Sequence, residues 1–335
     1  MRVLVTGGAG YIGSHTCVEL LNVGHEVFVI DNLCNGHEIA LDRVRGITNQ
    51  DLRFINADIR DLITLDNIFN TYKPEAVIHF AGLKAVGESV ANPLMYYDVN
   101  VGGSVSLLTA MSKAGCNNIV FSSSATVYGK PHYLPYDEEH PTNPVNPYGR
   151  TKLIIENIIR DSIKVDSKRR GTILRYFNPV GAHESGQIGE DPIGIPNNLM
   201  PYIAQVADGR REYLNIFGND YETSDGTGAR DYIHVVDLAL AHTSALNQNK
   251  LNNFEILNIG GGKGTTVFEL LRIFEEISGM SIKFKYSPRR VGDLAAFWAD
   301  SSKAFEKMNW QPERNIRQIC EDTWRWHQQN TIGYG

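Results

Sequence analysis

Cysteine is scarce and scattered in this chain, which contains only four cysteines in 335 residues. Cys17, Cys34, Cys116 and Cys320 form no C-x-x-C pair, so the sequence predicts neither a disulfide framework nor a thiolate metal site, and we expect no metal. No apolar stretch approaches the roughly 20 residues of a membrane-spanning helix. No basic and apolar leader precedes the first predicted strand. We therefore expect a cytoplasmic protein that is neither secreted nor embedded in a membrane.

An excess of positive charge is also missing. The chain has 32 Lys and Arg residues against 38 Asp and Glu residues, which gives a formal net charge of -6. This balance offers no general attraction for nucleic acid or for an anionic membrane, so any anion site must be local. The length suits a two-lobed protein with a substantial core, because domains commonly hold about 100 to 200 residues.

Glycine, by contrast, gathers directly after the first apolar segment. Residues 2–13 read RVLVTGGAGYIG, in which Gly7, Gly10 and Gly13 separate a predicted strand from a helical pattern. This order is typical of a pyrophosphate-binding turn, because glycine allows close backbone approach and the free amides at the helix start face the anion. A second apolar run ends at Asp31, where an acid accepts hydrogen bonds from a ribose and repels a 2'-phosphate. The sequence therefore predicts a dinucleotide site and favours NAD over NADP.

Strand-like and helix-like segments alternate through the first half of the chain. The predicted strands are 2–6, 26–30, 52–56, 76–81, 118–123 and 172–177, and the predicted helices include 11–23, 62–73 and 93–114. This repetition predicts an α/β fold with a parallel, doubly wound Rossmann sheet. Because the carboxyl ends of such strands line one crevice, we expect one ligand to be surrounded by Gly7, Asp31, Asp58, Phe80–Gly82 and Ser122–Ser124.

The second half of the chain has a different character. Residues 179–198 are rich in Gly, Pro, Asn and acidic residues, which is typical of a long functional loop. Mixed, shorter elements follow, with helices predicted at 199–208, 236–246 and 267–278 and strands at 213–217, 255–259 and 282–286. We predict an NAD-binding domain over residues 1–178 and a smaller mixed α/β substrate domain over residues 179–335, with part of 231–262 returning to the large sheet.

The candidate catalytic pair is Tyr148 and Lys152. Residues 147–157 read PYGRTKLIIEN, a proline followed by helical apolar spacing, so side chains four apart share one helix face. A free phenol is ionised to about one part in a thousand at neutral pH, whereas an ammonium some 4 Å away supplies on the order of 4 kcal/mol at an effective dielectric constant of 20. We expect Lys152 and a nicotinamide cation to lower the pKa of Tyr148 toward neutrality. The Ser124 hydroxyl can bond the same substrate oxygen. An isolated Y-x-x-x-K is usually an ordinary exposed pair, and its meaning here depends on the glycine turn.

Several motifs together resemble the extended short-chain dehydrogenase/reductase family. They are TGGAGYIG at 6–13, Asp31-Asn32, HFAGLKAVGES at 79–89, SSSATVYG at 122–129 and YGRTK at 148–152. Within that family the chain resembles the UDP-galactose (UDP-glucose) 4-epimerases, through RYFNPVGAH at 175–183, GTGARDYIHV at 226–235 and RRVGDLAAFWAD at 289–300. The resemblance covers nearly the whole chain.

This resemblance implies an isomerase of galactose metabolism that interconverts UDP-galactose and UDP-glucose with tightly held NAD. Tyr148 would take the proton of the sugar O4 during oxidation at C4, the 4-keto sugar would rotate, and hydride would return to its opposite face. The resemblance further implies a homodimer that pairs helices near 93–114 and 148–163.

The resemblance and the motifs also give two sets of site residues. The set expected to contact NAD is Gly7, Gly10, Tyr11, Ile12, Gly13, Asp31, Asn32, Asn35, Asp58, Ile59, Phe80, Ala81, Gly82, Lys84, Asn100, Ser122, Tyr148, Lys152, Tyr176 and Phe177. The set expected to contact the UDP-sugar is Ser124, Tyr148, Asn178, Asn197, Asn198, Leu199, Asn215, Ile216, Phe217, Arg230, Arg290, Asp293 and Phe297. Two arginines in the second set can neutralise two phosphate charges.

Phe297 is expected to lie against the hexose, where a bulky aromatic ring disfavours N-acetylated sugars. Trp298 is the alternative inward-facing residue. Three other functions remain open. A 4,6-dehydratase would place an acid just after the serine, where this chain has Ala125 and Thr126. A UDP-uronate 4-epimerase or decarboxylase would need a partner for the C6 carboxylate, and a non-catalytic NAD-sensing protein would have no need of the Tyr, Lys and Ser set.

Overall fold

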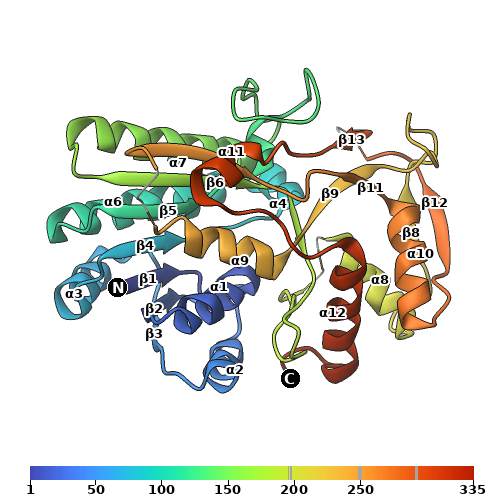
Figure 1. The fold of residues 1–335 in the computed structure, drawn as a ribbon, viewed down its shortest axis with the longest axis horizontal. Helices are drawn as coiled ribbons and strands as arrows, with labels where there is room; N and C mark the ends of the chain where they lie inside the picture. The colour runs from blue at the N-terminus through green and yellow to red at the C-terminus, as the bar shows by residue number, and fades with distance from the viewer. Residues whose placement is uncertain (195, 197, 248–250, 291–292) are drawn as a thin grey trace.

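The computed structural model describes residues 1–335 except 195, 197, 248–250 and 291–292. Its larger lobe is built on a seven-stranded sheet in which all neighbouring strands are parallel. The strands follow the order β10 (Phe254–Ile259), β6 (Arg170–Tyr176), β5 (Asn118–Ser122), β4 (Ala76–His79), β1 (Arg2–Thr6), β2 (Glu26–Asp31), β3 (Arg53–Asn56). The chain order reverses at β1, which lies between β2 and β4 (Figure 1). This confirms the predicted doubly wound sheet.

Helices cover both faces of this sheet. One face carries α1 (Tyr11–Asn22), α2 (Glu38–Thr48) and α9 (Val235–Ser244), and the other carries α3 (Leu62–Tyr72), α6 (Gly103–Ala114) and α7 (Pro147–Val165). Successive residues of β1 alternate between the layers, because side chains of a strand point to opposite faces. Val3 and Val5 belong to the first core, and Leu4 belongs to the second. Both cores are closed to water, which fixes the strand ends that build the site.

The predicted helix over 93–114 is divided in the structure. A short α5 (Pro93–Tyr96) leads into a π-helical turn, Tyr97–Gly102, before α6 begins at Gly103. A Cβ at Gly103 would lie 2.5 Å from Ile59 Cδ1, so glycine is needed for this close approach. The wider turn contains Asn100, whose side chain points back to the loop after β4. Helical spacing alone does not reveal such a turn.

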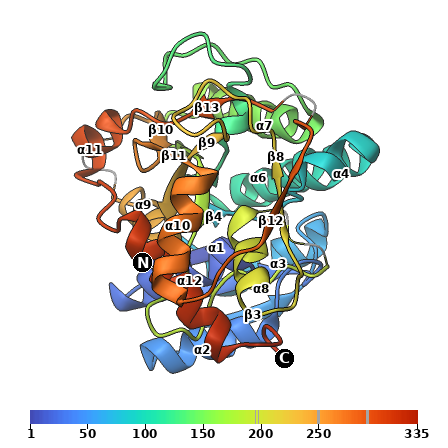
Figure 2. The ribbon, with the colours of Figure 1, turned by 90° about the vertical axis from the view of Figure 1, so that its right-hand side faces the viewer.

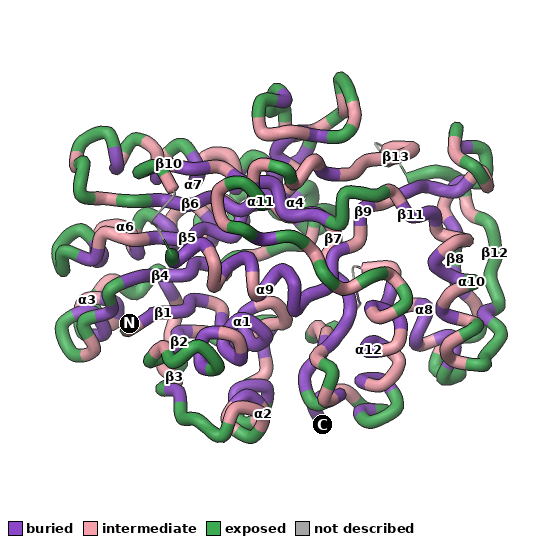
Figure 3. The backbone as a smooth tube through the Cα atoms, viewed as in Figure 1, coloured by how far each residue is buried: buried purple, intermediate pink, exposed green. Residues whose placement is uncertain are grey.

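The smaller lobe combines two short sheets with three packed helices (Figure 2). One sheet pairs β8 (Leu214–Phe217) with β12 (Phe284–Ser287), and the other centres on β9 (Ala229–His234), flanked by β7 (Asn178–Val180), β11 (Gly264–Thr266) and β13 (Ala296–Phe297). The helices α8 (Leu199–Ala207), α10 (Val267–Ser278) and α12 (Ile316–Gln329) share a separate apolar core. Figure 3 shows that β12 is exposed, unlike the central strands of the large sheet.

The chain crosses between the lobes more than once. After β9 it returns to the large sheet, where α9 packs on α1 and β10 pairs with β6. α11 (Ser302–Met308) then contacts β10 before the chain ends in α12 of the smaller lobe. The helices α2, α4 (Val86–Ala91), α11 and α12 and the strands β7, β9, β11 and β13 were not among the predicted elements. The domain boundary between residues 178 and 179 stays a prediction.

None of the helices in the described part of the chain combines the length and the apolar character needed to cross a bilayer.

Candidate active site

The first candidate site, here called the strand-end cavity, opens at the carboxyl ends of β1, β2 and β4 and has a volume of about 650 Å3. Gly7 turns the chain there with a φ of 73°, and a Cβ at this position would lie 2.7 Å from the Ala81 amide nitrogen. A Cβ on Gly13 would lie 2.2 Å from the Gly7 carbonyl oxygen. No side chain caps the start of α1 after Gly10. The backbone is thus bare where a pyrophosphate is expected to bind.

Acidic residues mark the far end of the strand-end cavity. Asp31 accepts hydrogen bonds from the amides of Ala9 and Leu33 at 3.1 and 2.9 Å, while burial raises the pKa of its carboxyl group. Asn32 donates to Asp58 at 3.0 Å, and hydrogen bonds from Arg60 lower the pKa of Asp58 to about 2. Two carboxylates therefore face the part of the cavity where a ribose with free hydroxyls would fit.

Tyr148 and Lys152 lie at the opposite end, both lining the cavity and both buried. The Lys152 ammonium lies 5.8 Å from the centre of the Tyr148 ring and donates a 2.8 Å hydrogen bond to the Ser122 carbonyl. Burial lowers the pKa of Lys152 to about 8 against the opposing charge of Glu156.

The pKa of Tyr148 is raised in the protein without a nicotinamide, and the fall expected once the cofactor adds its charge stays a prediction. Burial raises it well above its ordinary value, with a further contribution from Tyr176, and a hydrogen bond with Ser124 offsets only part of the rise. The protein alone therefore stores Tyr148 as a neutral phenol, and its ionisation requires added positive charge at the site.

Ser124 lies beyond the end of β5, because this strand ends at Ser122, one residue before the predicted end at Ser123. It is the N-cap of a 3-10 turn, Ala125–Val127, where its Oγ accepts from the amide and hydroxyl of Thr126 at 3.2 and 3.0 Å. The hydroxyl proton of Ser124 remains available to another acceptor. The turn thus orients this hydroxyl beside the Tyr148 phenol.

The strand-end cavity is lined by nearly the whole set expected to contact the coenzyme. The exceptions are Asn100, Ser122 and Phe177, which do not line it. The Asn100 side chain accepts a hydrogen bond from the Leu83 amide and donates to the Leu83 carbonyl and to the Thr151 hydroxyl. Its neighbour Val99 lines the cavity instead. Asn100 therefore supports the loop that forms one side of the cavity, and direct contact with the coenzyme stays a prediction.

A second candidate site, here called the arginine cavity, lies in the smaller lobe and has a volume of about 370 Å3. Its lining includes Asn178, Asn198, Leu199, Asn215, Ile216, Phe217, Arg230, Arg290 and Asp293 from the expected substrate set. Arg230 forms an ion pair with Asp293, and the Arg290 guanidinium lies 4.0 Å from the centre of the Phe217 ring. Asn197 lies outside the described residues, and Ser124 and Phe297 do not line this cavity.

Phe297 belongs to neither lining, although its neighbour Arg230 lines the arginine cavity. Its ring centre is 6.0 Å from that of Phe177 and 4.9 Å from the Arg230 guanidinium. Trp298 faces the other way, because its ring occupies the space beside Gly264 of β11. The orientation favours Phe297 over Trp298 as the residue that faces a bound sugar.

Some lining residues belong to no motif, although residues 189–193 lie within the predicted functional loop 179–198. Residues 189–193 line the strand-end cavity together with Tyr334, which is 145 positions from Gly189 but bonds to its carbonyl oxygen. The arginine cavity contains a third arginine, Arg211, whose guanidinium lies over the Tyr202 ring. These residues come from segments that no motif connects, so only the fold brings them to the sites.

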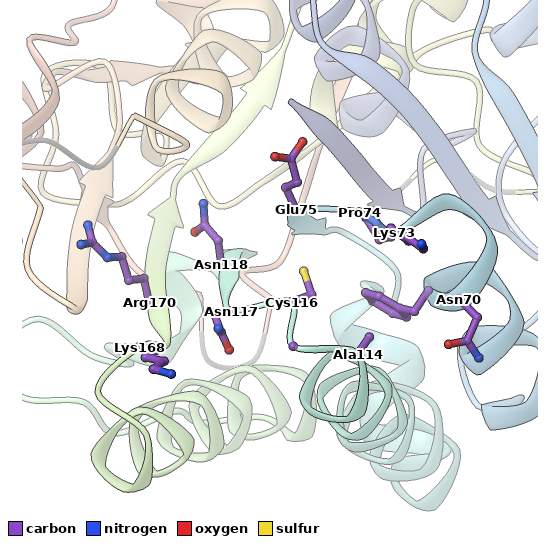
Figure 4. A pocket seen from close by; sticks show the side chains of 12 residues that line it. Asn70, Lys73, Pro74, Glu75, Ala114, Cys116, Asn117, Asn118, Lys168 and Arg170 are labelled. Atoms are coloured by element: carbon purple, nitrogen blue, oxygen red, sulfur yellow. The ribbon is translucent and has the colours of Figure 1, made fainter.

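A further cavity, of about 520 Å3, opens at the opposite edge of the large sheet (Figure 4). Its lining includes three cations. Lys73 directly follows α3, Lys168 lies shortly after the end of α7, and Arg170 is the first residue of β6. The C-terminus of a helix carries a partial negative charge that nearby cations offset. These cations are explained by the helix ends, and nothing else at this edge indicates a ligand.

A Rossmann sheet with a glycine turn, a Tyr-Lys pair on one helix and a separate arginine-lined cavity defines the class of extended short-chain dehydrogenases/reductases. Comparison with known proteins agrees. A family profile described as GDP-mannose 4,6 dehydratase matches residues 4–323. UDP-glucose 4-epimerases from Bacillus subtilis and Bos taurus are 54% and 53% identical to the chain, over 100% of it and 99% and 98% of their own lengths.

A solved structure extends this likeness to three dimensions. The UDP-glucose 4-epimerase of Bifidobacterium longum, in complex with NAD+ and UDP, is 47% identical with a TM-score of 0.96, covering 99% of this chain and 100% of that one. The chain belongs to the UDP-glucose 4-epimerase family.

Proposed function

We propose that this protein interconverts UDP-galactose and UDP-glucose, using bound NAD. The observation that carries the proposal is the pair of chemically different cavities, one at the ends of the parallel strands and one in the smaller lobe. The strand-end cavity fits a dinucleotide, since glycines expose its backbone and Asp31 faces the ribose end. The arginine cavity fits a nucleoside diphosphate, since Arg230 and Arg290 can pair with two phosphates. The Bifidobacterium relative was solved with NAD+ and UDP.

NAD, when bound, supplies a nicotinamide that can accept a hydride from sugar C4 and return it. Tyr148 acts on the sugar O4, taking its proton as the carbon is oxidised and giving it back on reduction. Ser124 donates to the same oxygen and orients it. The buried ammonium of Lys152 stabilises the phenolate form of Tyr148 once a second positive charge is present, which answers the high pKa that burial imposes.

The arginine cavity fixes the nucleotide, and the hexose is held loosely. Asn178, Asn215 and the arginines lie in the smaller lobe, whereas we propose that the sugar meets mainly the ring of Phe297, which lies beside the Arg230 guanidinium. Loose contact is required, because a 4-keto sugar must present both of its faces in turn. We propose that Phe297 crowds an N-acetyl group and so favours the unsubstituted sugars.

The decisive experiment is to incubate the purified protein with UDP-galactose without added cofactor and to follow UDP-glucose by chromatography. Formation of UDP-glucose supports both the reaction and the retention of NAD. No product, with or without added NAD, contradicts the proposal. UDP-galacturonate in parallel tests the uronate alternative, and loss of water from the sugar would indicate a dehydratase, for which Ala125 and Thr126 provide no acid.

The proposal includes a homodimer in the cytoplasm. Val90 and Leu94, beside α7 on the helices before the π-helical turn, are 63% and 82% exposed, and Val105 on α6 is 45% exposed. Apolar side chains grouped at these helices suit pairing with the same helices of a second copy. Light scattering of the eluted protein tests the dimer: a monomeric mass contradicts it.

A further inference from the structure

Glu190 contacts one residue from the lining of each cavity, although no motif marks it. It lines the strand-end cavity itself. Its Oε1 accepts a hydrogen bond from Asn198 Nδ2 at 2.6 Å, and the same oxygen lies 3.4 Å from Lys84 Nζ. Lys84 lines the strand-end cavity, and Asn198 lines the arginine cavity. One carboxylate oxygen therefore serves both sites.

The segment that carries Glu190 is fixed on both sides. Asp191 accepts from the Tyr334 amide at 2.8 Å, and its carbonyl oxygen lies 2.9 Å from His37 Nε2. Ile193 donates to Asn35 Oδ1 at 3.1 Å. The Glu190 side chain is 8% exposed. It is thus held in place by the fold and is not a mobile surface group.

The contact with Glu190 determines how the Asn198 amide is turned. A carboxylate only accepts hydrogen bonds, so the amide must present its NH2 group to it. Asn198 is also the N-cap residue of α8, yet its side chain makes no capping bond that would turn the amide otherwise. The carboxylate therefore selects one of the two orientations in which the amide oxygen and NH2 group could exchange places. Lys84 compensates the buried negative charge of Glu190.

We infer that Glu190 is a positioning residue for nucleotide-sugar binding, which acts by fixing the amide of Asn198 at the arginine cavity. The inference rests on the proposed function and names one of its determinants. It makes a prediction opposite in sign to simple electrostatics. Removing a negative charge near a diphosphate should by itself tighten binding, whereas loss of the orientation of Asn198 should weaken it.

The test uses the holoenzyme, with UDP as the probe. Calorimetry measures the affinity for UDP, and the rate at which UDP-glucose forms from UDP-galactose gives kcat and KM. Glu190→Gln keeps the volume but offers Asn198 both a donor and an acceptor. We expect the Kd for UDP to rise about tenfold, as a charge-assisted bond gives way to a neutral one, with KM rising similarly and kcat and Tm little changed. Glu184→Gln, an exposed glutamate of the same loop, should leave all four values unchanged.

A double-mutant cycle with Asn198→Ala completes the test. Because Glu190 acts through Asn198, Glu190→Gln should change UDP affinity less than about twofold in the Asn198→Ala background, where there is no amide left to orient. Unchanged or tighter UDP binding in the single variant would overturn the inference, as would a full loss of affinity in both backgrounds. A wild-type protein that neither binds UDP nor epimerises would instead refute the proposed function.

Discussion

The two cavities are built in different ways. The strand-end cavity depends on bare backbone at the ends of buried parallel strands, where Gly7 and Gly13 leave no room for a Cβ. The arginine cavity is formed by side chains from separate elements of the smaller lobe, including β7, β8 and β9. A site made of backbone depends on a few glycines, whereas a site made of side chains can lose one group and keep the others. The cavities should therefore respond differently to substitution.

The largest effect is expected at Tyr148 in the strand-end cavity. Tyr148→Phe removes the hydroxyl that exchanges the proton, so turnover should fall by about 1,000-fold, while bound NAD and UDP affinity stay near their wild-type values. Formation of UDP-glucose measures turnover, the NAD content after denaturation measures bound NAD, and calorimetry measures the affinity for UDP. Tyr133→Phe, at an exposed site, serves as the control. Activity retained in Tyr148→Phe would remove this residue from its catalytic role.

Gly13→Ala tests the backbone site. The added Cβ would lie 2.2 Å from the Gly7 carbonyl oxygen, so the turn must deform, and we expect purified protein with little bound dinucleotide. NAD content is measured by the absorbance of the released nucleotide. Gly46→Ala is a matched control in α2, because its Cβ would have 4.0 Å to its nearest neighbour. A full NAD content in Gly13→Ala would contradict the proposed turn.

Arg230→Leu tests the side-chain site. The guanidinium is expected to pair with a phosphate, and a charge-assisted hydrogen bond contributes about 1.5–3 kcal/mol, so UDP affinity should fall by about 10- to 100-fold. NAD content should not change, because Arg230 does not line the strand-end cavity. Calorimetry with UDP measures the loss. The control is Arg317→Leu on α12, because Arg317 also forms an ion pair, with Glu276, but at an exposed site. Loss of NAD from Arg230→Leu would show that the cavities are not independent.

Phe297→Ala should alter selectivity rather than overall rate. Removing the ring opens space beside Phe177 and Arg230, and we expect the kcat/KM ratio for UDP-N-acetylglucosamine over UDP-glucose to rise about tenfold, within the range that pocket volume can supply. Trp298→Ala, whose ring packs beside Gly264, should leave the ratio unchanged. A wild-type enzyme that already uses both sugars equally would disprove the role of Phe297.

The smallest effect concerns the stability of the large lobe in acid. Burial lowers the pKa of His15 and of His79 to about 3, whereas an unfolded histidine titrates near about 6.5. Between these values the unfolded state binds more protons, so the free energy of unfolding should fall as the pH drops from 6.5 toward 3. Urea denaturation at several pH values measures the slope. His79→Gln should make it shallower, and an unchanged slope would exclude His79 as a contributor.

The difference between the cavities also explains what the sequence could predict. The strand-end cavity follows from one contiguous motif, because Gly7, Gly13 and Asp31 belong to a strand, turn, helix and strand read in order. Tyr148 and Lys152 were found from their spacing, but the rise that burial imposes on the pKa of Tyr148 in the protein without a cofactor could not be predicted, because burial depends on the surrounding fold. The arginine cavity was found only through family resemblance, since its residues are dispersed over several segments.

Local spacing failed where tertiary contacts decide the geometry. The predicted helix over 93–114 contains a π-helical turn, which ends directly before the close approach of Gly103 to Ile59. Glu190 carries no motif, and its proximity to Lys84 and Asn198 arises from a segment tied to Tyr334 near the end of the chain. Such contacts link positions more than a hundred residues apart, which no local pattern records.

The pairing of β10 with β6 has a consequence for how the protein is made. The large sheet receives its last strand only after β7, β8 and β9 of the smaller lobe have been synthesised. Until Ile259 leaves the ribosome, β6 is an open sheet edge, and an open edge invites pairing with other chains. The coenzyme lobe therefore cannot mature before β7, α8, β8 and β9 of its neighbour have been translated, and the two lobes are expected to acquire their final structure together rather than in turn.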